Sequence, residues 1–404
     1  METREAVEET SVAGLPEQIQ TILQHEKTQQ KVVVRKILPE LRKPKPRYRA
    51  EKSWLRRIGL RLRDDSQFLR STIQFSFASL CLWIGLEFVL FVRWGYSGGT
   101  LPLFDRPPGV EGFLPISALM SAAYWLHTGI INLIHPSGLF ILLAIVLASF
   151  VVKKGFCGWF CPIGTLSESL WMVGQRMFKR NLALPRWIDV PLRSLKYLFL
   201  GFFLYSIAKM TTNDLGAFIY SPYNKMADVK MYAFFADISR AALYTLGGLI
   251  VLSVLVKNFW CRFLCPYGAL LGIIGWFSPM RITRTKSHCI DCILCTEACP
   301  SSIAVHKAGR VWSDECTSCM ACVQVCPVKE TLEMRIRPKS QRVPGWVVGS
   351  LLVGVFVAVT GAAMLAGIWQ NSIDNTEYLR RFKTLETPIY QHFQGHVPAY
   401  GPND

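Results

Sequence analysis

The chain has 404 residues, of which 51% are hydrophobic, and its mean hydropathy is +0.26. A soluble protein of this length needs fewer apolar residues, so the composition favours a membrane protein. The formal net charge of +17 could indicate nucleic-acid binding, but the excess is concentrated in one segment and no recognition fold accompanies it. We therefore expect no nucleic-acid partner.

The first 70 residues form a basic segment. Residues 31–70 hold fourteen Lys or Arg against four acidic residues. The positive-inside rule places such a block in the cytoplasm, near anionic lipid, although a solvated tail without a specific partner would have the same composition. Residues 1–30 are polar and lack the apolar core of a signal peptide, so we expect the N-terminus to stay in the cytoplasm.

Five apolar segments follow that could cross a bilayer with help from flanking residues, since a spanning helix needs roughly 20 apolar residues. A further apolar segment, 113–134, is expected to lie in the outer interface or to dip back into the membrane, because its crossing would export the basic stretch 153–196. The expected spans are residues 71–93, 137–152, 195–211, 241–256 and 345–369.

The predicted fold is an all-α polytopic membrane protein with about five transmembrane helices and a small α+β bacterial-type 2[4Fe-4S] ferredoxin domain. We expect it in the bacterial inner (cytoplasmic) membrane, with the ferredoxin domain on the cytoplasmic side. The expected parts are a basic N-terminal segment (1–70), a membrane domain (71–280), the ferredoxin-like domain (281–340), a C-terminal transmembrane helix (341–370) and a periplasmic tail (371–404).

Eight of the thirteen cysteines lie in two runs, "CIDCILCTEACP" and "CTSCMACVQVCP", which begin at Cys289 and Cys316. Each run reads C-x2-C-x2-C-x3-C-P, the spacing of bacterial ferredoxins that bind [4Fe-4S] clusters. Zinc sites do not favour this doubled run, and disulfides are unexpected on a basic cytoplasmic segment. The sequence therefore predicts two [4Fe-4S] clusters.

In such runs the fourth cysteine ligates the other cluster. We also expect that cysteine to start a helix, and the intervening "IAVHKAGRVW" to form a hairpin that turns at Ala308 and Gly309. The cluster-1 cysteines are Cys289, Cys292, Cys295 and Cys326, and the cluster-2 cysteines are Cys316, Cys319, Cys322 and Cys299.

Two further cysteine pairs lie behind apolar segments, in "KKGFCGWFCPIGTLSE" and "KNFWCRFLCPYGALLG". The two stretches match at both cysteines and at the following proline and glycine, which indicates an internal repeat. A spacing of four residues puts both thiols of a pair on one side of a helical turn, or of the loop that ends it. The paired cysteines are Cys157, Cys161, Cys261 and Cys265.

The paired cysteines allow several interpretations. Four thiolates brought together would suit a third iron-sulfur cluster or a zinc ion. The pairs could instead exchange electrons as dithiols and disulfides, belong to two separate sites, or fill an apolar interface. A third centre at the membrane edge would connect a lipid-soluble donor with the ferredoxin clusters.

This combination of motifs resembles the membrane polyferredoxins related to NapH, to the C-terminal part of NosR and to CcoG, over residues 71–336. The resemblance implies electron transfer between the quinone pool or a cytoplasmic donor and a periplasmic respiratory reductase, or copper reduction during oxidase maturation. Only the twelve motif cysteines and their prolines carry over. A NosR-like protein would carry an extracytoplasmic domain before the spans, where this sequence has a short basic segment that we expect in the cytoplasm. The last apolar segment and the tail also leave the subfamily open.

Other candidate residues are fewer. Glu87, within the first expected span, could accept a proton from a quinol, with Lys209 as its partner, although both side chains could also snorkel to the surface. His127 and His135 could serve a quinone or haem, or be ordinary polar anchors. His288 and His306 adjoin the cluster motifs, and Cys81 is expected to be a small packing residue.

We therefore expect an electron-transfer subunit that works with other subunits of a membrane redox complex and with the quinone pool, and that could form part of a quinol dehydrogenase. One alternative is an assembly factor or metal reductase for a respiratory metalloenzyme. Another is a membrane regulator that senses redox state. The absence of a dinucleotide fingerprint argues against nicotinamide chemistry in this chain.

Overall fold

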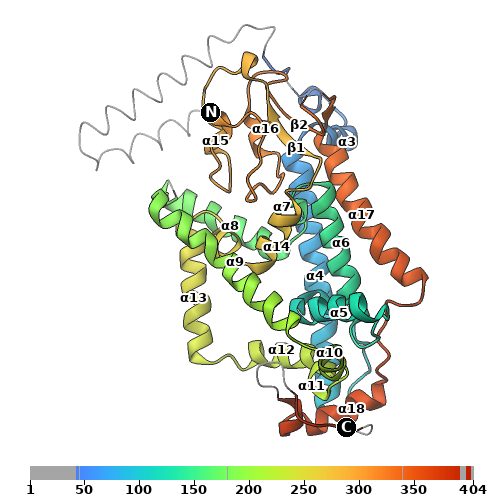
Figure 1. Cartoon of the computed structure of the whole chain (residues 1–404). Coiled ribbons are helices and arrows are strands. Elements are labelled where there is room, and N and C mark those ends of the chain that lie inside the picture. The colour runs from blue at the N-terminus through green and yellow to red at the C-terminus, as the bar shows by residue number, and fades with distance from the viewer. Residues whose placement is uncertain (1–41, 45, 180, 339, 392–396, 402–404) are drawn as a thin grey trace. The chain divides into compact units, whose positions relative to one another are not determined.

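The computed structural model describes residues 42–44, 46–179, 181–338, 340–391 and 397–401, and these are mostly helical (Figure 1). Most of the basic segment, residues 1–41, and parts of the tail lie outside the described residues. The chain forms two compact units. Unit 1 comprises Met1–Gln74, Ser149–Lys196 and Gly248–Ser350, and unit 2 comprises Phe75–Ala148, Tyr197–Gly247 and Leu351–Asp404.

Two described helices are long and apolar enough to cross a membrane: α4 (Ser66–Tyr96) and α17 (Gly345–Leu365). They correspond to the first and last expected spans. Helices α12 (Ala227–Ala236) and α13 (Arg240–Leu255) meet at 82° and would give a third span if the bent pair acts as one. The described residues thus support two or three spans, and the expected five are not confirmed.

The remaining apolar segments are short or interrupted by charge. The segment 137–152 forms α6 (Pro136–Val151), which is shorter than a span, and 195–211 lies in α9 (Arg186–Ala208), whose first turns carry charged residues and Pro191. The segment 113–134 forms α5 (Pro115–Thr128), which ends at Gly129 with φ 71°. Its 14 residues are too few to cross a bilayer, and its interfacial position stays a prediction.

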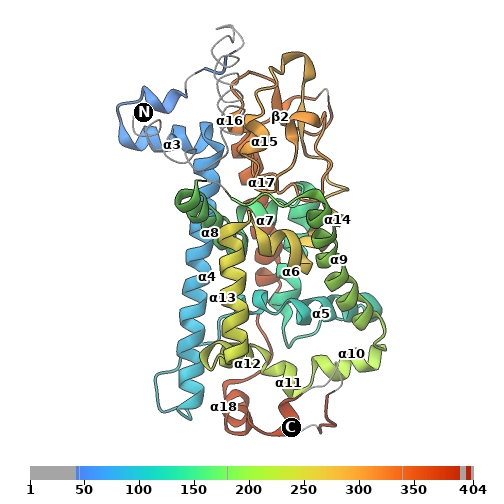
Figure 2. The ribbon, with the colours of Figure 1, turned by 90° about the vertical axis from the view of Figure 1, so that its left-hand side faces the viewer.

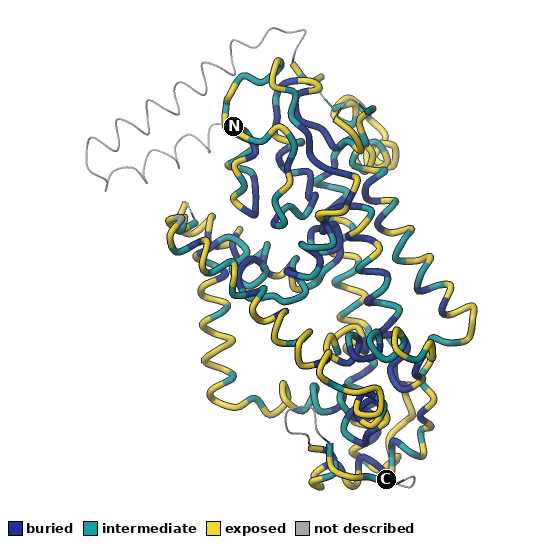
Figure 3. Tube along the Cα trace, viewed as in Figure 1, coloured by how far each residue is buried: buried dark blue, intermediate teal, exposed yellow. Residues whose placement is uncertain are grey.

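Helix α13 is almost entirely exposed although its residues are apolar (Figure 3). Such a surface is unfavourable in water and indicates contact with lipid or with another protein.

The chain repeats one local order of elements around its two cysteine pairs. Each cysteine pair follows an apolar helix, α6 or α13, and precedes an amphipathic or apolar helix that starts at the proline. The remaining elements of unit 1 are η1 (Arg47–Arg49), α3 (Trp54–Asp64), α7 (Gly155–Trp159), α8 (Pro162–Phe178), the π-helical turn η3 (Trp260–Leu264), α14 (Pro266–Ile274), η4 (Lys286–His288), α15 (Leu294–Glu297), η5 (Val305–Lys307) and α16 (Ala321–Val325).

The ferredoxin-like part is built on an antiparallel sheet of β1 (Arg281–Arg284), β2 (Leu332–Arg335) and β3 (Arg342–Val343), in that order. Ile282 pairs with Met334, and both are buried, which fixes the register because a slip of one residue would expose them.

Two local predictions about this part were wrong. The segment between the cysteine runs is not a hairpin: it forms η5, and its end pairs with β1, where the Arg284 amide donates to the Gly309 carbonyl at 2.7 Å. The segment therefore forms backbone hydrogen bonds with the edge of β1 instead of pairing with itself. The fourth cysteine of each run follows a helix, α15 or α16, rather than starting one.

Unit 2 has an aromatic core. Phe91 of α4 packs edge-on against Tyr378 of α18 (Asn375–Thr384), with ring centroids 5.1 Å apart, and both side chains are buried. The described part of the C-terminal tail is therefore folded into unit 2. The other elements of unit 2 are η2 (Pro108–Phe113), α10 (Thr212–Ile219), α11 (Pro222–Lys225) and η6 (Pro388–Tyr390).

Candidate functional site

The eight ferredoxin cysteines lie in the part of the chain that carries the sheet β1–β3. All four cluster-1 cysteines line one pocket, together with Arg284 and His306. The cluster-2 cysteines also lie close together, since burial and the nearby thiols of Cys319 and Cys316 raise the pKa of Cys299 to about 12. The two groups adjoin, because the Cys295 thiol is among those that raise the pKa of Cys322.

The backbone of the two runs is repeated as closely as the cysteines. Asp291 and Ser318, each just before the second cysteine of its run, have φ of 47° and 50°. Ile293 and Met320, each just after it, have φ of 61° and 62°. Left-handed conformations cost free energy in residues other than glycine and persist only where the surroundings impose them. Both loops thus curve so that their first three cysteines point to a common centre.

The donor set fits iron-sulfur clusters. Buried thiols with raised pKa are protonated in the absence of a cation, whereas iron supplies the positive charge that favours the thiolate ligand. In the part of the chain that the structure describes, no three His, Cys, Asp or Glu side chains are placed to hold one metal ion. A cluster spreads its cysteine ligands over several irons.

The paired cysteines occupy equivalent positions in the internal repeat. Cys161 and Cys265 are the N-caps of α8 and α14, and their Sγ atoms accept the backbone N–H of Gly164 and Gly268 at 3.4 and 3.3 Å. The proline after each cysteine takes the first helical position, where its missing N–H costs nothing. A helix N-terminus favours negative charge, but burial outweighs this effect and raises the pKa of the Cys265 thiol, so the thiolate form needs a bound cation.

The glycine of each motif has a packing role that the sequence pattern alone did not reveal. A Cβ atom on Gly164 would lie 2.6 Å from the Cys157 carbonyl oxygen, and one on Gly268 would lie 3.0 Å from that of Cys261. Any larger residue would push the N-terminus of the helix away from the first cysteine of the pair. The glycine thus keeps the two cysteines of each pair close together.

The two pairs meet in one place. Burial raises the pKa of Cys261 well above its usual value, and the thiols of Cys161, Cys265 and Cys157 raise it further. Four thiols from the two halves of the repeat therefore share one buried environment, as a joint centre requires.

Buried cations surround the paired cysteines. Lys196 is fully buried and forms ion pairs with Glu315 and, at 3.3 Å, with Asp314. Lys154 is also buried, and its ammonium lies 3.8 Å from Glu315. Two buried ammonium groups thus face two carboxylates, Glu315 and Asp314, beside the paired cysteines. These residues were not singled out by sequence reasoning, because their partners are over a hundred residues away.

Helix α7, which carries Cys157, packs directly on the cluster-2 loop. The Trp159 indole donates to the Ser318 carbonyl at 3.1 Å, and a Cβ on Gly158 would lie 2.6 Å from the Thr317 carbonyl oxygen. On the other side, Gln67 of α4 donates to the Cys319 carbonyl at 2.8 Å, and the Arg70 Nε donates to that of Gly158 at 2.7 Å. The paired cysteines therefore adjoin the cluster-2 cysteines.

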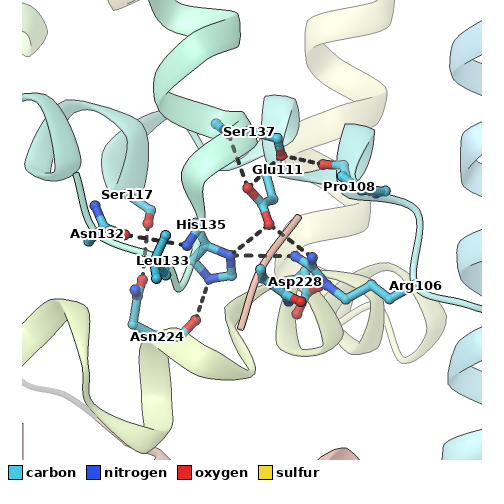
Figure 4. Close-up of polar contacts among 12 residues, drawn as sticks. Arg106, Pro108, Glu111, Ser117, Asn132, Leu133, His135, Ser137, Asn224 and Asp228 are labelled. Carbon is cyan, nitrogen blue, oxygen red and sulfur yellow. Dashed lines mark hydrogen bonds and ion pairs between the residues drawn. The ribbon is translucent and has the colours of Figure 1, made fainter. Parts of the chain in front are cut away.

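His135, one of the sequence candidates, lies in a buried ionic cluster of unit 2 (Figure 4). Arg106 bridges two fully buried carboxylates, with 2.9 Å to Glu111 and 2.5 Å to Asp228. The His135 Nε2 donates to the Asn224 carbonyl at 2.6 Å, and its Nδ1 lies 3.4 Å from Glu111. Burial by itself would raise the pKa of Glu111. The charge of Arg106 and the hydrogen bonds from His135 and Ser137 outweigh burial, so the pKa of Glu111 is lowered to about 2.

The other candidates are not brought together. Glu87 accepts the Trp83 indole N–H at 2.8 Å, and Lys209 lies over the Tyr205 ring, so within the described residues they do not form the expected pair. His127 is exposed whereas His135 is buried, which does not support joint haem ligation.

Two histidines lie beside the cluster motifs. His306 lines the cluster-1 pocket, and its Nδ1 lies 2.8 Å from the Thr296 hydroxyl. The carbonyl of His288 accepts from Thr331 at 3.3 Å. Cys81 is partly buried in α4, apart from the motif cysteines in sequence.

Two protein-family models match the chain. A "4Fe-4S binding domain" matches residues 134–181 and 241–285, which are the two halves of the membrane-edge repeat. A "4Fe-4S dicluster domain" matches residues 281–327, the two ferredoxin runs.

Several known proteins are similar to the chain. The putative electron transport protein YccM of Escherichia coli (strain K12) is 39% identical over 316 residues, which are 77% of this chain and 88% of YccM. Protein NirI of Paracoccus denitrificans is 28% identical over 55% of this chain and 32% of NirI. The methylamine utilization ferredoxin-type protein MauN of Methylobacillus flagellatus is 24% identical over 50% of this chain and 62% of MauN. No solved structure matches.

Proposed function

Because the chain belongs to the membrane-bound polyferredoxins, the 4Fe-4S family that includes YccM, we propose that it moves single electrons through three adjoining centres of unit 1. The centres are the cluster-1 cysteines, the cluster-2 cysteines and the paired cysteines. The observation that carries this proposal is the packing of α7 on the cluster-2 loop through Trp159 and Ser318.

The packing of unit 1 indicates the order in which the three cysteine groups follow one another. The cluster-2 cysteines adjoin both other groups. The Cys295 thiol of cluster 1 is near enough to raise the pKa of Cys322, and α7 packs on the loop that holds Cys319. The cluster-1 cysteines line a pocket at one end of this order, and Asp291 on its rim has an exposed side chain. A soluble donor or acceptor would therefore exchange electrons at cluster 1, and a membrane partner at the paired cysteines.

The paired cysteines are proposed to hold a third [4Fe-4S] cluster. Four adjoining thiols, two helix N-termini and two buried ammonium groups suit a centre with net negative charge. The match of the 4Fe-4S binding domain model to both halves of the repeat supports the same assignment. When bound, such a cluster accepts and donates one electron, while this chain's residues fix its position and surrounding charge.

In the cell, the proposed partners are the quinone pool or a cytoplasmic donor on one side and a respiratory reductase on the other. We place the protein in the inner membrane with the ferredoxin-like part facing the cytoplasm. The basic residues before α4 support that orientation through the positive-inside rule. Protease accessibility in inverted and right-side-out vesicles tests it, and cleavage near His306 only in right-side-out vesicles would contradict it.

The number of clusters is tested by metal analysis of anaerobically purified protein. The full chain should contain iron and acid-labile sulfide for three [4Fe-4S] clusters, and the double variant Cys157→Ser/Cys261→Ser should lose about a third of both. Cys81→Ser is the matched control and should keep all of it, because Cys81 belongs to none of the three groups. Unchanged iron in the double variant would remove the third cluster and favour a dithiol role.

The electron-transfer function is tested by reducing the protein in membranes with a quinol and following the cluster absorbance. Reduction that depends on the paired cysteines supports the proposal. Normal electron flow to a mature reductase in cells that lack this chain would instead favour an assembly role.

A further inference from the structure

Helix α3 is amphipathic and lies on the surface of unit 1 without covering its apolar residues. None of its eleven residues is buried, and Trp54, Leu55 and Ile58 are 67%, 64% and 42% exposed. With 3.6 residues per turn, these three positions and Leu62 fall within an arc of about 100°. An exposed apolar stripe of this kind indicates that another molecule covers it.

The flanks of the stripe are basic. By the same helical geometry, Arg61 and Arg57 lie about 20° and 60° beyond one edge of the arc. Arg63 and Arg56 lie about 80° and 100° beyond the other edge, on the polar face. Within the described residues, Arg56 and Arg63 are exposed and form no ion pair, whereas Arg61 is held over the Phe68 ring at 4.1 Å. Apolar residues between rows of arginine are the pattern of helices that lie in the surface of an anionic bilayer.

The position of α3 in the chain places it at the level where the membrane spans begin. Only Asp65 separates it from α4, and the chain turns there, so α3 runs away from the first turns of α4 (Figure 2). The first residue of α17 lies beside the first residue of α4, because a Cβ on Gly345 would be 2.5 Å from that of Ser66. Trp346, next to it, is 42% exposed, as is usual for aromatic residues at a membrane interface.

We propose that α3 binds the surface of an anionic lipid bilayer, with Trp54, Leu55 and Ile58 inserted among the acyl chains and Arg56 and Arg63 on the lipid phosphates. The two spans that begin at the same level bring this surface to the helix without an entropic cost of association. This proposal does not depend on the electron-transfer function.

Hydrogen exchange of the full-length protein in lipid nanodiscs tests the proposal. The backbone amides of residues 54–64 should exchange at least about tenfold more slowly in nanodiscs of phosphatidylcholine with phosphatidylglycerol than in phosphatidylcholine alone, because bound helices open rarely. The variant Arg56→Glu/Arg63→Glu should lose this difference. The variant Lys286→Glu/Lys307→Glu, which changes the charge equally at exposed positions elsewhere in unit 1, should keep it.

A photocrosslinking amino acid at position 55 supplies a second readout that does not depend on the arginine variant. Crosslinks to lipid support the proposal. Crosslinks only to another part of the chain or to a partner protein would overturn it, as would equal exchange rates in anionic and neutral nanodiscs.

Discussion

The Trp159 indole and the Ser318 carbonyl, 3.1 Å apart, join two parts of the chain that each carry a cysteine motif. Trp159 is fully buried, and it follows Cys157 by two residues, while Ser318 precedes Cys319. A buried hydrogen bond of this kind holds its two segments in one register because breaking it leaves polar groups unpaired. The distance between the paired cysteines and the cluster-2 cysteines therefore depends on this contact.

Trp159→Phe should keep most of the packing but leave the Ser318 carbonyl without its donor. We expect a loss of about 1–3 kcal/mol in the free energy of unfolding and slower electron transfer between the paired-cysteine centre and cluster 2. The rate of this electron transfer is measured by flash reduction, with the oxidation state of each cluster followed separately. Trp346→Phe, an exposed tryptophan at the start of α17, is the control and should behave as wild type. An unchanged rate in Trp159→Phe would remove this contact from the electron route.

Gly158→Ala should separate the same two segments by steric pressure. Its Cβ would lie 2.6 Å from the Thr317 carbonyl oxygen, so the backbone must move, at a cost of about 1–3 kcal/mol. We expect altered electron paramagnetic resonance coupling between the reduced clusters. Gly361→Ala, which would meet nothing within 4 Å, should leave the spectrum unchanged. Identical spectra for both variants would contradict the close packing of α7.

Arg106→Gln should destabilise unit 2 strongly. Without the guanidinium, two fully buried carboxylates lose their shared cation, and removal of one partner of a buried ion pair costs about 3–5 kcal/mol. Thermal unfolding in detergent at neutral pH measures the effect. Arg93→Gln changes an exposed arginine at the end of α4 and should shift the free energy of unfolding by no more than about 0.5 kcal/mol. Equal melting temperatures for the two variants would show that the buried cluster is not structural.

Glu111 should make unit 2 sensitive to acid but not to pH changes near neutrality. Its pKa is lowered to about 2, below the ordinary 4.5, so its contribution to stability is complete above pH 4.5 and is lost as the pH falls toward 2. Stability measured between pH 6 and pH 3 should therefore fall more steeply in the wild type than in Glu111→Gln. Parallel curves for the two proteins would contradict the lowered pKa.

Cysteine spacing by itself identified the ferredoxin-type iron-sulfur centres. Ligand spacing within one loop is a local property of the chain, and Cys289 to Cys299 and Cys316 to Cys326 lie in such loops. The crossed grouping is a prediction from the same spacing, and the four cysteines assigned to cluster 1 line one pocket. The repeat of the cysteine pairs was equally visible, because the Pro and Gly that build the helix N-terminus are close to the second cysteine in the chain.

Apolar composition was a weaker guide to membrane topology. Hydropathy counts residues along the chain, and it did not show that α6 stops short or that α12 and α13 meet at 82°. The prediction of a hairpin around Gly309 was wrong for a similar reason. That segment forms backbone hydrogen bonds with β1, which lies elsewhere in the sequence.

Tertiary structure alone decided which charges surround the centres. Lys196 and Glu315 are 119 residues apart, and Arg106 and Asp228 are 122 apart, so no periodicity links them. A buried charge is stable only with a partner, and the partner is chosen by how distant segments pack. The sequence thus determined the ligands and their local geometry, while the packing of remote segments determined their electrostatic environment and their order.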